Sequence, residues 1–189
     1  MKRFAIVLGF MLIASCAAAE TTVVRGTLFE GQSLTYTFTD DLGQKTEQQY
    51  SSNKLWTVSD GVSTNEMDLL WTARLTLTEG ASQTLDLAGG LTNRFGNPIS
   101  FAGVKWLQVN APESNSGTIT MGDEIAHWAT FLSGTNDSVV IRPGCGLMMI
   151  CPGTNTYGVT ATTGDLLKFV NDAVAYTNIV DVYLGGISQ

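Results

Sequence analysis

Apolar and polar residues alternate in short segments along this chain, and this pattern predicts β-strands. In residues 34–38 the apolar side chains are Leu34, Tyr36 and Phe38, so one face of the segment can be buried. No stretch of convincing length repeats with the 3.6-residue period of a helix, although one helical turn is expected within residues 65–71. The pattern therefore favours a protein built from strands.

Turn-forming residues separate the predicted strands at short intervals. Strands are expected at residues 55–58, 75–77, 84–87, 99–101, 104–109, 118–121, 139–141, 147–150, 157–160, 166–170 and 179–184. Turns are expected where Gly, Pro, Asn and Asp cluster, at residues 60–61, 89–90, 96–98, 134–137 and 152–153. Residues 44–53 are polar and are expected to form a loop or linker. This organisation predicts an all-β fold, a jelly-roll-like β-sandwich with a short N-terminal apolar segment.

The chain divides into three parts on this pattern. Residues 1–19 resemble an export or lipoprotein signal, residues 20–73 hold N-terminal strands and a linker, and residues 74–189 form the sandwich domain. With 189 residues, of which 44% are hydrophobic, the chain can bury one sizeable core.

The N-terminal segment resembles a bacterial secretory signal. Lys2 and Arg3 precede an apolar run at residues 4–13, which is too short for a bilayer that requires about 20 residues. Residues 13–16, Ile-Ala-Ser-Cys, resemble a lipobox, in which the cysteine is acylated and becomes the new N-terminus. Lipidation of Cys16 would hold the chain at a membrane surface, and it is the only membrane contact that the sequence predicts.

Two alternatives to lipidation remain open. The small residues 17–19 before Glu20 also fit cleavage of an ordinary export signal. The apolar segment can instead stay uncleaved and pack inside an assembly.

The distribution of charge argues against nucleic acid as a partner. The net charge is −7, and the ten basic residues are scattered singly through the chain. Proteins that bind a duplex need a basic patch or stripe that neutralises phosphates. We expect protein partners instead.

Two cysteines enclose an apolar run near the Pro143-Gly144 turn. Cys145 and Cys151 are separated by six residues of predicted strand, which places them roughly 20 Å apart, whereas a disulfide needs Cα atoms within about 7 Å. They are therefore not expected to pair with each other. Their even spacing puts both on one face of the strand, so we expect two small buried hydrophobic residues.

No constellation of catalytic or metal-binding residues is evident. The single histidine, His127, lies three residues after Glu124, but a carboxylate-bridged metal site needs a second such pair and a helical bundle. One histidine and two distant cysteines cannot form a zinc site, and Gly144-Cys145-Gly146 lacks the third glycine of a dinucleotide motif. The sequence thus predicts no enzyme and no cofactor. A hydrolase with a pair of carboxylates stays an alternative, because the chain has 17 acidic residues whose separations in space the sequence does not show.

Three passages resemble a group of small β-rich proteins encoded by tailed bacteriophages and prophages. They are TLDLAGGLTNRFGNPISFAGVKWLQVN (84–110), VVIRPGCGLMMICP (139–152) and YGVTATTGDLLKFVN (157–171), and the similarity covers about residues 55–187. The shared motifs are signatures of turns and strands without catalytic content. The resemblance implies a non-enzymatic part of a virus particle, such as a capsid decoration, a spike or a tail-associated protein.

This chain differs from that group in two features. It has Cys145 where a glycine is common, and it has an N-terminus that resembles an export signal. Virion proteins assemble in the cytoplasm, so the second feature favours an alternative, an exported cell-envelope lipoprotein with a β-sandwich binding domain. Location is therefore expected to be the virion or, alternatively, the cell envelope.

Tryptophans are the candidate anchors for protein contacts, because aromatic side chains give a large contact area with little loss of entropy. Trp56 and Trp71 lie at the edges of the N-terminal region and are the expected interface residues, whereas Trp106 lies in a strongly apolar strand and is expected in the core. The predicted partners are further copies of this chain, in a symmetric homo-oligomer, or a major capsid or tail protein.

Overall fold

The computed structural model describes residues 23–39, 44–122, 126–128, 132 and 137–188. Strands, joined by turns and loops, are the regular secondary structure of these residues. They are β1 (Gly26–Thr39), β2 (Lys45–Val58), β3 (Leu69–Leu77), β4 (Ser82–Asp86), β5 (Leu91–Thr92), β6 (Pro98–Ile99), β7 (Gly103–Asn110), β8 (Ile119–Gly122), β9 (Ser138–Ile141), β10 (Gly146–Ile150), β11 (Tyr157–Gly158), β12 (Leu166–Asn171) and β13 (Asn178–Ile187). The predicted all-β class is confirmed. The described residues include no helix long and apolar enough to cross a membrane.

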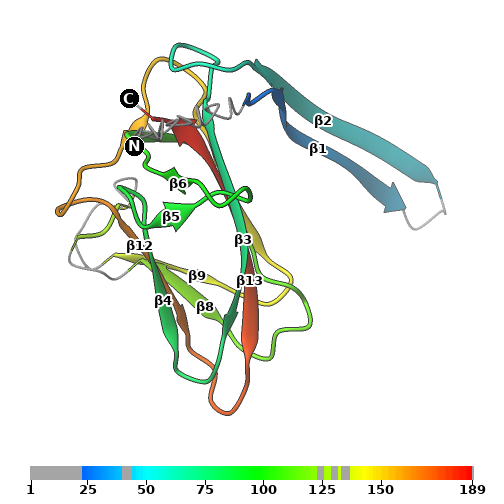
Figure 1. Ribbon diagram of the computed structural model, residues 1–189. Coiled ribbons are helices and arrows are strands. Elements are labelled where there is room, and N and C mark those ends of the chain that lie inside the picture. Colours follow the sequence, from blue (N-terminus) through cyan, green and yellow to red (C-terminus); the bar gives the residue numbers. More distant parts are fainter. Residues whose placement is uncertain (1–22, 40–43, 123–125, 129–131, 133–136, 189) are drawn as a thin grey trace, which may run out of the picture.

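Two antiparallel sheets form the body of the protein (Figure 1). The first sheet has the order β10-β7-β13-β3, with β11 also paired to β7, and the second has the order β4-β12-β8-β9. A short β5–β6 hairpin lies beside them. The hydrophobic core draws its side chains from both sheets, so the body is a β-sandwich.

The strands of the body pair in a nested order. Among the eight main strands, the first pairs with the last, the second with the seventh, the third with the sixth and the fourth with the fifth, as β3–β13, β4–β12, β7–β10 and β8–β9. Such nested pairs arise when one long antiparallel ribbon rolls up into two sheets.

Alternation of side chains produces the core, as the sequence pattern predicts. In β13 the residues Val180, Val182 and Leu184 are fully buried, while Asp181 and Tyr183 between them are half-buried on the outer face. Leu167 and Phe169 of β12 are also fully buried. Each such side chain contributes about 1.5–3 kcal/mol by leaving water.

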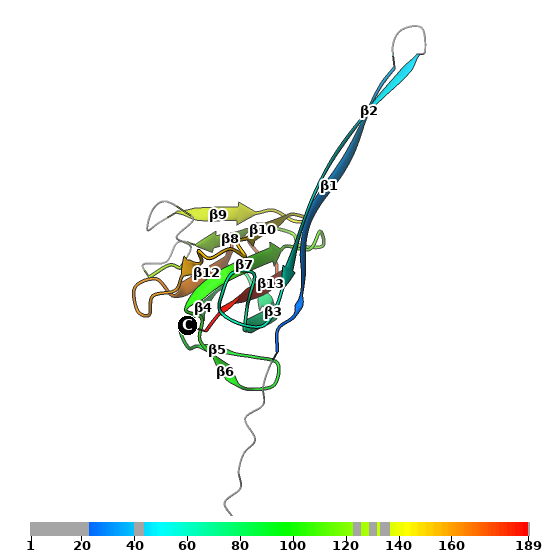
Figure 2. The ribbon, with the colours of Figure 1, turned by 90° about the horizontal axis from the view of Figure 1, so that it is seen from above.

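A long hairpin of β1 and β2 projects from the body, as Figure 2 shows most clearly. We call it the arm, residues 26–39 and 45–58. Here the predicted loop or linker at residues 44–53 is wrong, because residues from Lys45 onward are paired in β2. Polar residues lie on both faces of this strand because the arm is exposed on both faces, so no period of two in hydrophobicity is required.

The region between the arm and the body also differs from its prediction. Residues 65–71 form no helical turn; Asn65 takes a positive φ of 58° in a turn, and the residues from Leu69 onward belong to β3. The predicted boundary between residues 73 and 74 falls inside β3, a strand of the sandwich. The strands instead divide the chain between Val58 and Leu69. The predicted signal at residues 1–19, with Cys16, lies outside the described residues.

Candidate functional site

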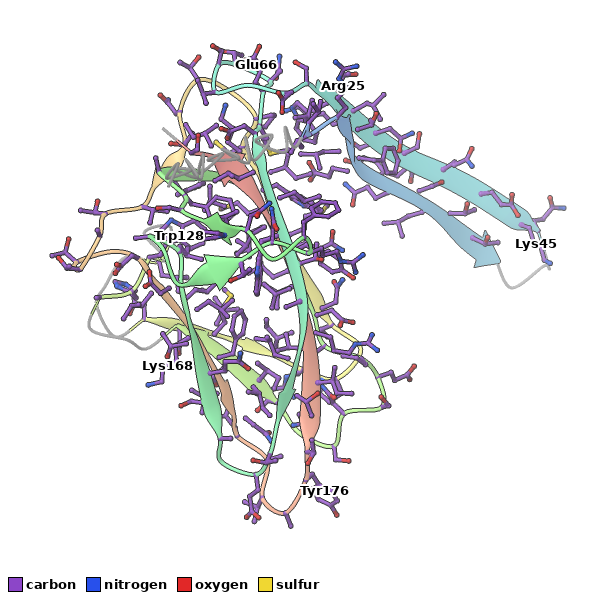
Figure 3. All side chains as sticks on the ribbon, in the orientation of Figure 1. Arg25, Lys45, Glu66, Trp128, Lys168 and Tyr176 are labelled. Atoms are coloured by element: carbon purple, nitrogen blue, oxygen red, sulfur yellow. The ribbon has the colours of Figure 1, made fainter. Side chains whose placement is uncertain are left out.

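The arm is a regular two-stranded ribbon. Its strands pair without interruption from Gly26 opposite Val58 to Thr39 opposite Lys45. At about 3.4 Å per residue, each strand is about 45 Å long. The side chains along the arm stand apart from the body (Figure 3). A two-stranded hairpin by itself is marginally stable in water, so an arm of this length gains stability if another surface covers it.

One face of the arm carries two apolar pairs with polar residues between them. We call it the Leu28 face, and along it the cross-strand pairs are Gly26–Val58, Leu28–Trp56, Glu30–Lys54, Gln32–Ser52, Leu34–Tyr50, Tyr36–Gln48 and Phe38–Thr46. Leu34 and Tyr50 are 62% and 58% exposed. Trp56 is half-buried, and the Lys54 ammonium lies 4.7 Å from the centre of its ring, a cation–π contact. This face combines aromatic anchors with an exposed apolar surface.

The opposite face, which we call the Phe29 face, carries one apolar pair. Phe29 and Leu55 lie opposite each other and are 56% and 64% exposed. The Phe29 ring lies over Gly31, where an added Cβ would come within 2.0 Å of the ring. Glycine at this position therefore lets the ring fold down onto the ribbon.

The base of the arm is fixed to the body by a buried lysine. In β7, Val104 pairs with Gly186 and Trp106 with Gly185, so Lys105 is an extra residue in a β-bulge. Its side chain is fully buried, and Nζ donates hydrogen bonds to the carbonyl oxygens of Ser63 at 2.5 Å and Glu66 at 3.0 Å. Burial lowers the pKa of this ammonium, and the nearby acidic Glu66 partly opposes the change.

The segment that Lys105 binds, residues 59–68, connects β2 to β3. Met67 is 3% exposed and packs against Gly185, where an added Cβ would lie 2.9 Å from its sulfur. The Asn65 amide donates to the Pro152 carbonyl at 2.7 Å. Val24, two residues ahead of β1, donates its amide to Asp60 Oδ1 at 2.9 Å. Both strands of the arm are thus attached at their base to residues 59–68.

An apolar groove of about 690 Å³ lies where the arm joins the body. Its lining comes from residues 23–25 ahead of β1, from the start of β3 and from the β5–β6 hairpin. Phe95, 72% exposed, and Leu70, 44% exposed, contribute apolar surface, and Arg25 and Arg94 contribute positive charge. Concave apolar sites with a few polar groups are the usual form of binding sites, so the groove is a second candidate surface.

A bidentate ion pair lies on the outer face of the first sheet. Arg74 Nε and Nη2 donate to the Asp181 carboxylate at 2.7 and 2.9 Å across the β3–β13 pair. This hydrogen bonding holds the pKa of Asp181 below its usual value of 3.8 and raises the pKa of Arg74. The geometry is good, but the Arg74 side chain is 65% exposed, so solvent weakens the pair.

The ion pair gives a testable pH dependence. We expect Arg74→Gln to lower the melting temperature slightly at pH 7, and the difference from the wild type to disappear in acid. A carboxyl group with a lowered pKa stabilises the fold above its unfolded pKa, and this contribution is lost as the pH falls through its folded pKa. Thermal melts from pH 7 to pH 2 measure this, with Arg142→Gln as the exposed control. A difference that persists unchanged at pH 2 would contradict the assignment.

The four tryptophans divide differently from the prediction. Trp56 is half-buried in β2 of the arm, and its role as an interface residue stays a prediction. Trp71 is only 9% exposed and belongs to the hydrophobic core, which argues against its predicted role as an interface anchor. Trp106, predicted in the core, is half-buried on the outer face and stacks on Tyr183 at 6.2 Å between ring centres. Trp128 is fully buried against Tyr157.

The cysteines and the histidine take structural positions. Cys145 and Cys151 are not bonded to each other, as predicted. The prediction that both are buried is wrong, because Cys145 is exposed in the turn before β10 and Cys151 is half-buried. His127 forms an isolated bridge with Leu166 of β12. Within the described ranges, no three His, Cys, Asp or Glu side chains gather as metal ligands.

A buried asparagine network went unnoticed in the sequence. The two hydrogens of Asn171 Nδ2 are shared among the carbonyl oxygens of Leu77, Thr78 and Tyr176, and its Oδ1 accepts from the Ala173 amide and from Asn178 Nδ2. Asn171 is 1% exposed and Asn178 is fully buried. The network joins the two sheets at one end of the sandwich. The sequence signals this network only through Asn171, a polar residue at the next inward position of β12 after Leu167 and Phe169.

No protein-family model matches this chain, and no curated protein has significant sequence similarity to it.

Proposed function

We propose that this chain is a non-enzymatic structural protein of a phage-type virion, such as a capsid decoration, a spike or a tail-associated protein. The observation that carries the proposal is the arm, an ordered ribbon whose apolar residues are exposed on both faces. A surface of this kind is suited to contact with another protein. The phage-protein resemblance of residues 55–187 supports the same function.

The body supports this function through its stability. A sandwich with a continuous core of this size can fold without disulfides or metals, which leaves its surfaces and its arm for contacts. The expected partners are further copies of this chain or a major capsid or tail protein.

A second candidate function rests on Cys16. The lipobox-like residues 13–16 favour an exported lipoprotein whose sandwich binds a partner at the cell surface. In this case the arm would serve the same purpose, a protein contact, but in the cell envelope.

Fractionation distinguishes the two functions. We expect the chain to band with purified virus particles from cells that produce it, at a fixed ratio to the major capsid protein. Recovery in the membrane fraction, with labelling by a palmitate analogue that Cys16→Ala abolishes, would overturn the virion proposal in favour of the lipoprotein. Intact mass of the mature chain supplies an independent readout, because an uncleaved chain is incompatible with a lipoprotein.

A further inference from the structure

Strand β3 is an open edge of the first sheet. It pairs with β13 on one side, and in the part of the chain that the structure describes residues 69–76 form no further backbone hydrogen bond on the other side. β3 has nine residues and no proline, whereas the other edge strands, β10, β4 and β9, have five, five and four residues. A long edge strand with unpaired N–H and C=O groups is a template for another strand.

The ladder shows which residues of β3 face this open edge. The N–H and C=O groups of successive residues point to opposite sides of a strand. Directly after β7, the Ala111 amide donates to the Cys145 carbonyl on the β10 side, so the even-numbered residues of β7 bond to β13, opposite odd-numbered partners. The even-numbered residues of β13 therefore bond to odd-numbered residues of β3. The backbone groups of Leu70, Thr72 and Arg74 point to the open edge.

Two cavities follow this edge. The apolar groove of about 690 Å³ is lined by residues 68–70 and 72, and a second cavity of about 410 Å³ is lined by residues 72–74. Successive side chains of a strand point to opposite faces, so a cavity that touches successive residues lies against the edge of the strand. The β5–β6 hairpin, between β3 and β4 in Figure 1, forms the opposite wall of the groove. The space is about 20 Å long, the length of a six-residue strand.

We propose that this edge binds an extended, acidic segment of another protein, which joins the first sheet as a strand beside β3. This inference rests on the proposed function, which supplies a protein of the particle as the partner. In strand addition, main-chain hydrogen bonds give affinity and side-chain pockets give specificity. The segment forms about six main-chain bonds, two to each of Leu70, Thr72 and Arg74.

The charges of the groove select an acidic segment. Arg25 and Arg94 line it, and neither guanidinium forms an ion pair with the described residues. The acidic residue of the lining, Asp68, accepts hydrogen bonds from the amide and the hydroxyl of Ser188. In a chain with a net charge of −7, two unpaired arginines at one groove are a local excess of positive charge. A carboxylate of the segment pairs with Arg94, which lines both cavities.

The apolar lining of the groove adds a second preference. Phe95 and Leu70 are 72% and 44% exposed. The side chains of an added strand alternate as those of β3 do, so apolar residues at every second position pack on these two side chains. Removal of this surface from water stabilises the complex.

A random library of eight-residue peptides displayed on yeast, selected on the purified full chain, tests the proposal. We expect the enriched peptides to contain aspartate or glutamate and to have apolar residues at every second position. An enriched peptide is then synthesised in two forms, each N-methylated at alternate amides. One form should bind at least about tenfold more weakly than the parent peptide and the other within about threefold of it, because only one set of amides faces β3.

Variants of the chain locate the site. Thr72→Pro removes an N–H from the open edge without removing a bond to β13, and it should weaken peptide binding at least about fivefold. Thr76→Pro is the matched control, because Thr76 has the same orientation in β3 but lines neither cavity. Arg94→Glu leaves β3 unchanged and should weaken binding of an acidic peptide at least about tenfold, whereas the exposed Arg142→Glu should change it less than about threefold.

Three results of these experiments would overturn the inference: no enrichment of acidic peptides, equal binding by Thr72→Pro and Thr76→Pro, or equal loss with both methylated forms. A reversible dimer of the full chain that Arg94→Glu dissociates would make a second copy the occupant of the groove. Peptide binding only by the form that begins at Glu20 would make residues 1–19 the occupant. Either outcome also overturns the proposal.

The particle experiment separates this inference from the proposed function. If the chain bands with particles but binds no peptide of the library, the virion function holds and strand addition at β3 is wrong. If the chain binds acidic peptides at β3 but fractionates with membranes, strand addition holds and the virion function is wrong.

Discussion

Replacing Asn171 by alanine is expected to lower the free energy of unfolding by about 3 kcal/mol or more. The variant leaves the carbonyl oxygens of Leu77, Thr78 and Tyr176 without their donor in a buried site. Each unsatisfied buried polar group costs about 1–3 kcal/mol, and some of these carbonyls will recover a partner by relaxation or from water. Urea unfolding followed by tryptophan fluorescence gives the change directly.

The control for this prediction is Asn155→Ala, which removes an exposed asparagine in the loop before β11. Such surface substitutions usually change stability by less than about 0.5 kcal/mol. A loss below about 1 kcal/mol for Asn171→Ala would show that the network is not what joins the two sheets at this end.

Replacing Lys105 by methionine is expected to cost about 3 kcal/mol of stability and to loosen the base of the arm. Methionine retains most of the volume of the lysine stem but cannot donate to Ser63 and Glu66. Hydrogen bonds from a charged group contribute about 1.5–3 kcal/mol each, less the cost of burying the ammonium. Hydrogen exchange should become faster in residues 59–68, and Lys45→Met, at the exposed end of β2, is the control. Unchanged exchange in that segment would contradict the anchoring role.

The pH dependence of Lys105→Met follows from the lowered pKa. Because burial lowers the pKa of Lys105 from 10.5, the folded chain holds fewer protons than the unfolded chain between the folded pKa and 10.5. Stability therefore rises with pH across that interval, and the variant lacks this contribution. The difference in stability between wild type and variant should grow as the pH approaches 10.5.

The sandwich was predictable because a strand with one buried face has apolar residues at every second position. In β13 the buried residues at every second position are Val180, Val182 and Leu184. In β3, Trp71 lies an even number of positions from the buried Leu75 and Leu77, so it is on the same, inward face and is a core residue. The prediction failed at Trp71 because position near the N-terminal region was given more weight than parity.

The arm and the bulge at Lys105 were not predictable from the alternation of apolar and polar residues. Residues 44–53 of the arm have no buried face, so their pairing depends on register with β1 and not on hydrophobic alternation. At Lys105 one extra residue interrupts the alternation between Val104 and Leu107, and only the partner strand reveals that the lysine is the inserted residue.

The attachment of the arm has a mechanical consequence. Val24, just ahead of β1, donates its amide to Asp60, and β2 continues into the same segment, which Lys105 binds, so both strands of the ribbon are tied at their base to residues 59–68. A force on the far end of the arm is therefore transmitted to β7 and β13, the middle strands of the first sheet, and does not only rotate the arm about a flexible joint.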